Sequence, residues 1–149
     1  MRYVFDTNIL VFYIKGKETK AYIEKNYSPF GEDNEVIISI VSVGEIRALA
    51  IKNGWGTRRV QAVQDLLARM IVVEVRFDEL VRLYAELDAY SQGKVNQGQA
   101  KFSARNMGKN DLWIAATTRL VEGVLLTADN DFDHLGNTHF VVEKVRNQD

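Results

Sequence analysis

Four acidic residues occupy positions where carboxylates could act together: Asp6, Glu45, Asp111 and Asp129. Asp6 and Asp129 each end a short apolar segment, Glu45 follows another, and Asp111 opens a predicted helix. In an open parallel sheet, ligands bind beyond the carboxyl ends of the strands. Parallel strands would bring all four acids to that edge, where carboxylates about 4 Å apart repel by about 4 kcal/mol at an effective dielectric of about 20. A bound cation or raised carboxyl pKa values must offset this repulsion.

The chain offers oxygen ligands for such a cation and little else. It has no cysteine, and its two histidines, His134 and His139, are too few for a histidine-rich zinc site. Hard oxygen donors favour Mg²⁺ or Mn²⁺. Two such ions roughly 3.5 to 4 Å apart would suit the attack of water on a phosphodiester. The acids therefore predict a metal-dependent hydrolase.

Each acid also has a purely structural explanation, because helix N-termini favour acidic side chains by about 0.3–1 kcal/mol. Ser42-Val43-Gly44-Glu45 matches a capping box, with Ser42 as the N-cap. Asn110 could cap a helix that has Asp111 in its first turn, and Asp129 could cap a turn that closes at Gly136. Asp6 is harder to explain in this way, because it ends an apolar strand that should be buried, and buried acids need partners.

The elements that must position these acids alternate between two periodicities. Short apolar runs predict strands over residues 2–6, 35–40, 71–75, 124–127 and 139–145. Helical patterns predict helices over 7–15, 17–27, 42–54, 57–70, 77–90 and 111–121, with Gly54 as a left-handed C-cap and a short helical turn between Asp129 and Gly136. This alternation predicts an α/β fold with a mainly parallel five-stranded sheet and crossovers on both faces.

Length and charge set broad limits on the class of protein. The 149 residues predict one domain, residues 1–149. We expect a soluble, cytoplasmic protein without a membrane segment, because the chain shows no signal-peptide pattern and no apolar run approaches about 18 residues. The net charge of -1 argues against a strongly basic, non-specific nucleic-acid binder, but is compatible with a local basic surface.

The polar segment from Gly93 to Gly108 admits two structures, a mobile loop or a short extra helix. Four basic residues lie in this segment or directly after it: Lys94, Lys101, Arg105 and Lys109. They could contact RNA, or they could simply be solvated.

Four motifs in order along the chain carry a family resemblance. They are Val4-Phe5-Asp6-Thr7-Asn8, Ser42-Val43-Gly44-Glu45-Ile46, Asn110-Asp111-Leu112-Trp113-Ile114-Ala115-Ala116-Thr117, and Leu126-Thr127-Ala128-Asp129-Asn130-Asp131-Phe132. The chain resembles a PIN domain and, within that group, the VapC-type toxins of toxin–antitoxin pairs. The resemblance spans nearly the whole chain. It implies a three-layer α/β/α sandwich with a central parallel sheet, often a homodimer, and a Mg²⁺- or Mn²⁺-dependent endoribonuclease that is neutralised by a cognate antitoxin.

The resemblance also implies roles for individual residues. Asp6 and Asp111 would be the chief metal ligands, Glu45 a ligand directly or through water, and Asp129 the fourth acid, which Asp131 assists or replaces. Flanking polar residues, Thr7, Asn8 and Thr127, would orient carboxylates or the attacking water; Thr7 and Asn8 are equally suited to helix capping. The expected RNA products carry 5′-phosphate and 3′-hydroxyl ends.

The antitoxin that the resemblance implies would cover this site. We expect it to place an arginine or lysine among the carboxylates, in the position of the metal's charge. Phe12, Tyr13 and Tyr22 either line its groove or pack in the core.

Three alternative functions remain to be weighed. A phosphohydrolase of the haloacid dehalogenase type needs a second aspartate two residues after the first, where this chain has Asn8. A phosphoacceptor receiver domain needs an acidic pair after the first strand, whereas Thr7 follows Asp6. A PIN-like module that binds RNA or protein without catalysis would be favoured by the loss of one of the four acids. All four are present.

Overall fold

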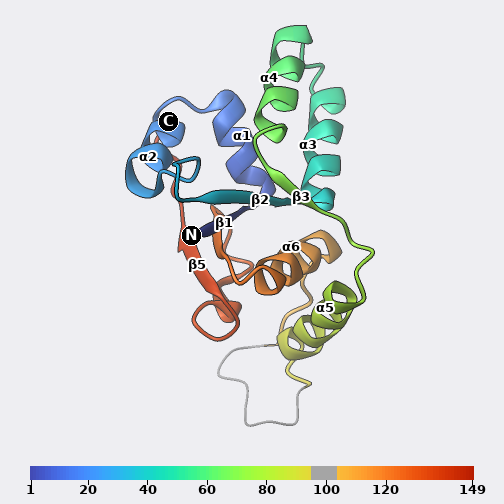
Figure 1. Cartoon of the computed structure of the whole chain (residues 1–149). Coiled ribbons are helices and arrows are strands. Elements are labelled where there is room, and N and C mark those ends of the chain that lie inside the picture. Colours follow the sequence, from blue (N-terminus) through green and yellow to red (C-terminus); the bar gives the residue numbers. More distant parts are fainter. Residues whose placement is uncertain (95–103) are drawn as a thin grey trace.

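A single parallel sheet forms the centre of the computed structural model, which describes residues 1–94 and 104–149 (Figure 1). Its strands lie in the order β3-β2-β1-β4-β5, and all neighbouring pairs are parallel. The strands are β1 (Arg2–Phe5), β2 (Glu35–Ser39), β3 (Ile71–Val73), β4 (Val124–Thr127) and β5 (Val141–Lys144). The five-stranded α/β fold predicted from the sequence is confirmed.

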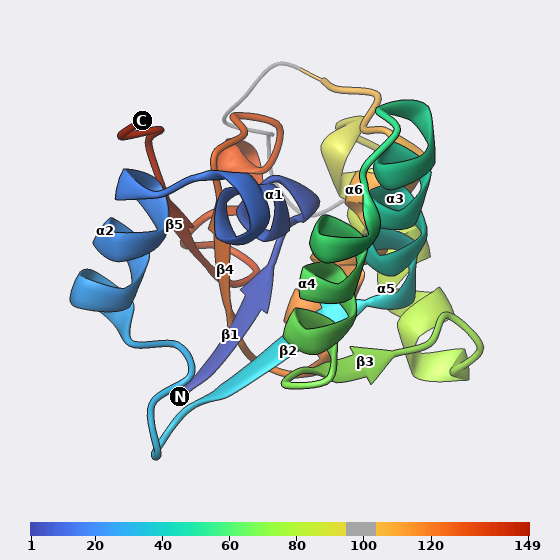
Figure 2. The same cartoon turned by 90° about the horizontal axis from the view of Figure 1, so that it is seen from above.

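Helices cover both faces of the sheet (Figures 1 and 2). On one face lie α1 (Thr7–Lys15), α2 (Glu18–Tyr27), α3 (Ile40–Lys52) and α4 (Thr57–Leu67), and on the other lie α5 (Asp78–Ser91) and α6 (Lys109–Leu120). A short 3₁₀ helix, Asp133–Leu135, precedes β5 and ends at Gly136. The three-layer α/β/α sandwich is therefore also confirmed.

The alternation of side chains along the strands fills the two cores. On β1, Tyr3 and Phe5 pack with the helices α1 to α4, whereas Val4 packs with α5 and α6. Successive strand residues point to opposite faces, so a strand covered on both sides must be apolar throughout. The central strand β1 has β2 on one side and β4 on the other, which leaves its carboxyl end enclosed by two neighbours.

The start of α3 differs from the sequence prediction. The helix begins at Ile40, and its N-cap is Ser39, whose hydroxyl oxygen accepts the N–H of Val41 at 3.2 Å. The capping box at Ser42 is wrong, because a serine at the end of β2 already satisfies the first turn of the helix. The predicted left-handed Gly54 is confirmed, with φ of 59°. Glu45 is thereby free of a capping role.

Two other predicted caps are also wrong. The helix α6 begins at Lys109 after Gly108, so Asn110 lies inside the helix and is not its N-cap. The 3₁₀ helix has Phe132 as its N-cap, so Asp129 does not cap it. Neither Asp111 nor Asp129 is therefore explained by the capping scheme that the sequence suggested.

Part of the polar segment from Gly93 to Gly108 falls outside the described residues. Residues 95–103, which include Lys101, are not among the described residues. The prediction of a loop or a short helix in that stretch therefore lies outside them. Residues 104–108 have no regular secondary structure and lead directly into α6. Within 1–94 and 104–149, no helix is long and apolar enough to span a membrane.

Candidate metal centre at the carboxyl ends of the strands

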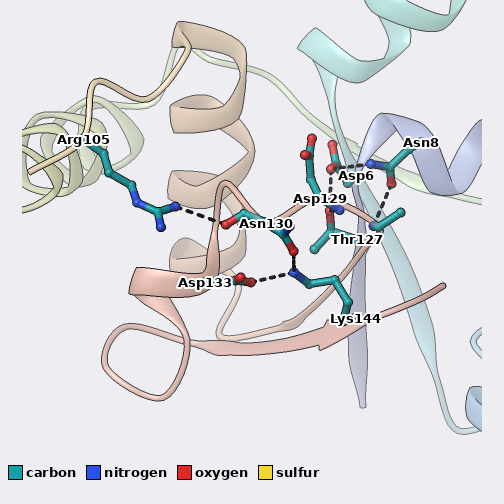
Figure 3. A network of polar contacts seen from close by, with 9 residues as sticks. Asp6, Asn8, Arg105, Thr127, Asp129, Asn130, Asp133 and Lys144 are labelled. Carbon is teal, nitrogen blue, oxygen red and sulfur yellow. Dashed lines mark hydrogen bonds and ion pairs between the residues drawn. The ribbon is translucent and has the colours of Figure 1, made fainter. Parts of the chain in front are cut away.

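Asp6 is the buried centre of the site, with only 4% of its surface exposed. Its Oδ1 accepts the N–H of Thr7 at 2.7 Å, and its Oδ2 accepts the Thr127 hydroxyl at 2.7 Å and the Asn8 amide at 3.1 Å (Figure 3). Burial raises the pKa of Asp6, and repulsion from Asp129 and Glu45 adds to the rise, whereas the bonds from Thr127 and Thr7 oppose it. The carboxylate is therefore fixed in orientation by three donors.

The strands themselves place these donors. Phe5 on β1 is in register with Leu126 on β4, so the next residues along each strand, Asp6 and Thr127, are neighbours. The N–H of Asp6 continues the ladder by donating to the carbonyl of Leu126 at 3.0 Å. Asp6 is also the N-cap of α1, which turns the backbone of Thr7 toward its carboxylate. One residue thus ends a strand, caps a helix and faces the site.

Glu45 is held by the neighbouring helix. The Thr7 hydroxyl donates to Glu45 Oε1 at 2.7 Å, and the same hydroxyl oxygen lies 3.0 Å from the hydroxyl of the buried Ser42. This contact joins α1 to α3 at the carboxyl ends of β1 and β2. Ser42 therefore supports the site from inside α3 and does not cap the helix.

Asp111 enters the same cluster from the opposite layer, in the first turn of α6. Its pKa is raised to about 7, first by burial and then by repulsion from four carboxylates, in the order Asp6, Asp131, Asp129 and Glu45. The three other acids predicted from the sequence, together with Asp131, therefore all act electrostatically on Asp111. Within the described part of the chain, no hydrogen-bond donor contacts the Asp111 carboxylate.

The loop after β4 carries Asp129 and is tied to the rest of the site. The N–H of Asp129 donates to the Thr127 hydroxyl oxygen at 2.9 Å, and the N–H of Ala128 donates to Asn8 Oδ1 at 3.2 Å. Thr127 therefore bridges the first and fourth acids, since it donates to Asp6 and accepts from Asp129 (Figure 3).

Two basic residues that the sequence did not assign to the acid site hold the far side of this loop (Figure 3). Lys144, at the end of β5, donates to Asn130 Oδ1 at 2.6 Å and to Asp133 Oδ1 at 2.7 Å. Arg105 donates to the carbonyl of Asn130 at 3.2 Å. Because Asn130 stands between Asp129 and Asp131, these contacts position the two acids. Arg105, for which the sequence left open contact with RNA or solvation, is exposed and also donates to this loop.

A protein-family comparison matches the PIN domain model over residues 3–137. The chain belongs to the PIN domain family. No curated protein is significantly similar to this PIN domain in sequence.

Several solved structures share the fold of this PIN domain. VapBC2 from Rickettsia felis, bound to a DNA fragment from its promoter, aligns with a TM-score of 0.72 at 18% identity, covering 97% of this chain and 98% of that one. VapBC-1 from nontypeable Haemophilus influenzae gives a TM-score of 0.70 at 21% identity with the same coverage. DNA-bound VapBC from Salmonella typhimurium gives 0.68 at 17%, again with the same coverage. At these identities the likeness shows the fold.

The donor set of this PIN domain suits a hydrated cation more than an enclosed one. Among the described side chains, no group of three or more His, Asp and Glu residues has the geometry of a ready-made metal cage. Mg²⁺ typically keeps several waters and takes only one or two carboxylates together with substrate phosphates. The oxygen donors and the mutual repulsion around Asp111 fit such an ion, because a cation would offset that repulsion.

Proposed function

We propose that this PIN domain, spanning residues 1–149, is a Mg²⁺- or Mn²⁺-dependent endoribonuclease and the toxin of a toxin–antitoxin pair. The observation that carries the proposal is the gathering of acids at the carboxyl ends of the strands, where burial and then repulsion from Asp6, Asp131, Asp129 and Glu45 raise the pKa of Asp111 to about 7. Acids gathered at the carboxyl ends of parallel strands are costly for the fold. Their concentration is best explained by a cation that binds there.

Each acid then has a role that follows from its contacts. Asp6 and Asp111 would hold the ion from opposite layers of the sandwich, with Glu45 and Asp129 on either side. The hydroxyls of Thr7 and Thr127 orient the Glu45 and Asp6 carboxylates, respectively. Asn8 contacts both the Asp6 carboxylate and the backbone of Ala128, which fixes the distance between β1 and the Asp129 loop. Asp131 adds negative charge near Asp111.

The reaction that this arrangement supports is hydrolysis of a phosphodiester. The oxygen of water bonds to phosphorus, the bond from phosphorus to the 3′-oxygen breaks, and that oxygen takes a proton. A bound divalent cation supplies a more acidic water and neutralises charge on the departing oxygen. The protein's own residues hold the acidic side chains in fixed orientations. The products carry 5′-phosphate and 3′-hydroxyl ends.

The toxin assignment is supported by the solved neighbours, which include a toxin–antitoxin complex from Klebsiella pneumoniae and a member of the VapBC family of toxin–antitoxin systems from Mycobacterium tuberculosis. We expect a cognate antitoxin to cover the acids with a basic side chain, and the PIN domain to act as a homodimer in the cytoplasm. Tyr13 is buried against Phe5 and donates to Glu24, so it belongs to the core. Phe12 and Tyr22 are half-buried against the same core and keep part of their surface for a partner.

The decisive experiment incubates a mixed RNA pool with purified protein, freed of any partner, in Mg²⁺, Mn²⁺ or EDTA. The wild type should cut in either metal and not in EDTA, and Asp6→Asn should not cut while keeping its fold. Calorimetric titration with Mn²⁺ gives a second readout, since Asp111→Asn should weaken binding of the metal alone. Binding of RNA without cutting by correctly folded protein would point to the non-catalytic module.

A further inference from the structure

A trough of about 570 Å³ opens beside the acid cluster and follows α3 away from it. It is lined by Thr7, Val41, Gly44, Glu45, Ala48, Leu49, Lys52 and Asn110. The six residues from α3 have helical spacing and form one continuous stripe along the helix. The residues of α3 that are buried in the core lie elsewhere: Ser42, Val43 and Ile46. The trough therefore uses a face of α3 that the fold leaves open.

The two ends of the trough differ in charge. One end contains Glu45 and Thr7, which belong to the acid cluster, together with the Asn110 side chain. The other end contains Lys52, seven residues and two helical turns from Glu45, or about 10 Å along the axis. Between them lie Ala48 and Leu49, and the apolar Val41 lies one turn beyond Glu45. A ligand in this trough would have one anionic group at the cation-binding acids and another near the lysine.

Gly44 is the least expected residue in this lining. Glycine is a poor residue for a helix interior, and it is normally retained where a neighbour leaves no room for a side chain. Here a Cβ added at Gly44 would meet no atom of the described chain within 4 Å. Packing among the described residues therefore gives no reason for glycine. A side chain at this position would enter the trough next to Glu45.

We propose that this trough is a subsite for single-stranded RNA that receives the nucleotide flanking the cleaved phosphodiester. This inference rests on the ribonuclease function proposed above. The base lies over Val41, Gly44, Ala48 and Leu49, and Lys52 neutralises the next phosphate along the strand. Because the apolar lining offers few groups that read base edges, the subsite accepts bases of any identity. Single strands are favoured because only an unstacked base can enter the trough.

Gly44→Gln tests the subsite, with Ala62→Gln as the control. Ala62 is exposed on α4 and lines no part of the trough. Gly44→Gln should raise KM for RNA about tenfold, the order expected for loss of one base contact. The midpoint temperature of its thermal unfolding should equal or exceed that of the wild type, because glutamine is a better helix former than glycine. Ala62→Gln should leave KM unchanged.

Lys52→Gln tests the other end of the trough, with Lys25→Gln on α2 as the control. Lys52→Gln should weaken RNA binding and reduce the salt dependence of log affinity by about one phosphate contact. Both lysines are exposed, so neither change should alter the fold. Equal salt dependence in the two variants would overturn the assignment of Lys52.

A modified substrate gives a readout that a merely structural effect would not move. Once the wild type's cut is mapped, an abasic residue is placed on each side of that bond in turn. At one of the two positions, the abasic residue should lower kcat/KM of the wild type about tenfold. The same abasic substrate should hardly lower kcat/KM of Gly44→Gln, because that variant has already lost the base contact.

Three results would contradict the inference, and they are distinguishable. Unchanged KM for Gly44→Gln in an active enzyme would overturn the subsite and leave the ribonuclease standing. Unchanged KM together with weaker antitoxin binding would assign the trough to the protein partner. Absence of RNA cleavage and binding by the wild type would overturn both proposals.

Discussion

Asp6 and Asp111 face the same site and both have raised pKa values, but the fold surrounds their carboxylates differently. Asp6 is almost fully buried and accepts three hydrogen bonds from neighbouring residues. Asp111 is half-buried, has no donor among the described residues, and has its pKa raised to about 7. The fold thus offsets part of the burial of the Asp6 carboxylate with its own donors, whereas no described residue does so for Asp111, whose charge would be balanced by a proton or a cation. Asp6 therefore belongs to the part of the site that hydrogen bonds hold in place, and Asp111 to the part that responds to pH and to cations.

The largest expected effect is on activity, and it is the same for both residues. Asp6→Asn and Asp111→Asn should each reduce RNA cleavage by about 10³-fold or more, because each removes a proposed ligand of the cation. Initial rates in Mn²⁺ with folded protein would measure this, and Glu18→Gln on the exposed start of α2 is a suitable control. Full activity of either aspartate variant would remove that residue from the proposed metal site.

The two variants should then differ in stability. Asp6→Asn should lower the free energy of unfolding by about 1–3 kcal/mol, because its amide would face the donors of Thr127 and Asn8. Asp111→Asn should raise it at pH 8 by about 1 kcal/mol, after allowing for solvent screening of a half-buried group. Urea unfolding without metal would measure both changes. Changes of the same sign would contradict the contrast drawn here.

The pH dependence of the metal-free protein sharpens the contrast further. Since the pKa of Asp111 is raised from 3.8 to about 7, the folded state binds more protons than the unfolded state between these values. This group's contribution to stability should therefore fall as pH rises from about 4 to about 7 and stay constant above that. Asp111→Asn should remove this part of the slope, and Mn²⁺ should offset the loss at pH 8. A slope shared by wild type and variant would exclude Asp111 as its source.

A smaller effect is expected from the residue that connects the first and fourth acids. Thr127→Val removes the hydroxyl that donates to Asp6 and accepts the N–H of Asp129. We expect cleavage to fall about 10- to 100-fold, as for other partners of metal ligands. Thr118→Val is a matched control, because the buried Thr118 hydroxyl donates to the carbonyl of Ile114 inside α6 and, among the described residues, has no other hydrogen bond. Equal activities of the two valine variants would show that the bridge has no role.

The smallest effect should come from the basic residues around Asn130. Lys144→Met removes the contacts with Asn130 and Asp133, and we expect a loss of about 3- to 10-fold in kcat with little change in KM. The exposed Arg146→Met serves as the control. A change in KM alone would mean that Lys144 contacts the substrate and does not position the loop.

Sequence reasoning could find the acids because their placement depends on topology. A residue that ends a central parallel strand must lie at the carboxyl edge, and Asp6 was placed in the site on that ground, whereas Thr127 was named only through the family resemblance. The cap of α3 was mispredicted because Ser39 and Ser42 both have suitable side chains, and only the length of β2 decides between them. Lys144 was missed because its place beside Asn130 depends on the register of β5 against β4, which the pattern of apolar residues does not define.

The hydrogen bond from Thr127 to Asp6 joins residues that are 121 positions apart. The central strand of the sheet is the first to be synthesised, yet one of its two neighbours comes from the last quarter of the described elements. Pairings between residues so distant in sequence raise the contact order, and folds of high contact order form slowly. A ribosome making this protein therefore carries the first strand unpaired on one side until β4 has emerged. The four acids can therefore gather only after synthesis has passed Asp129.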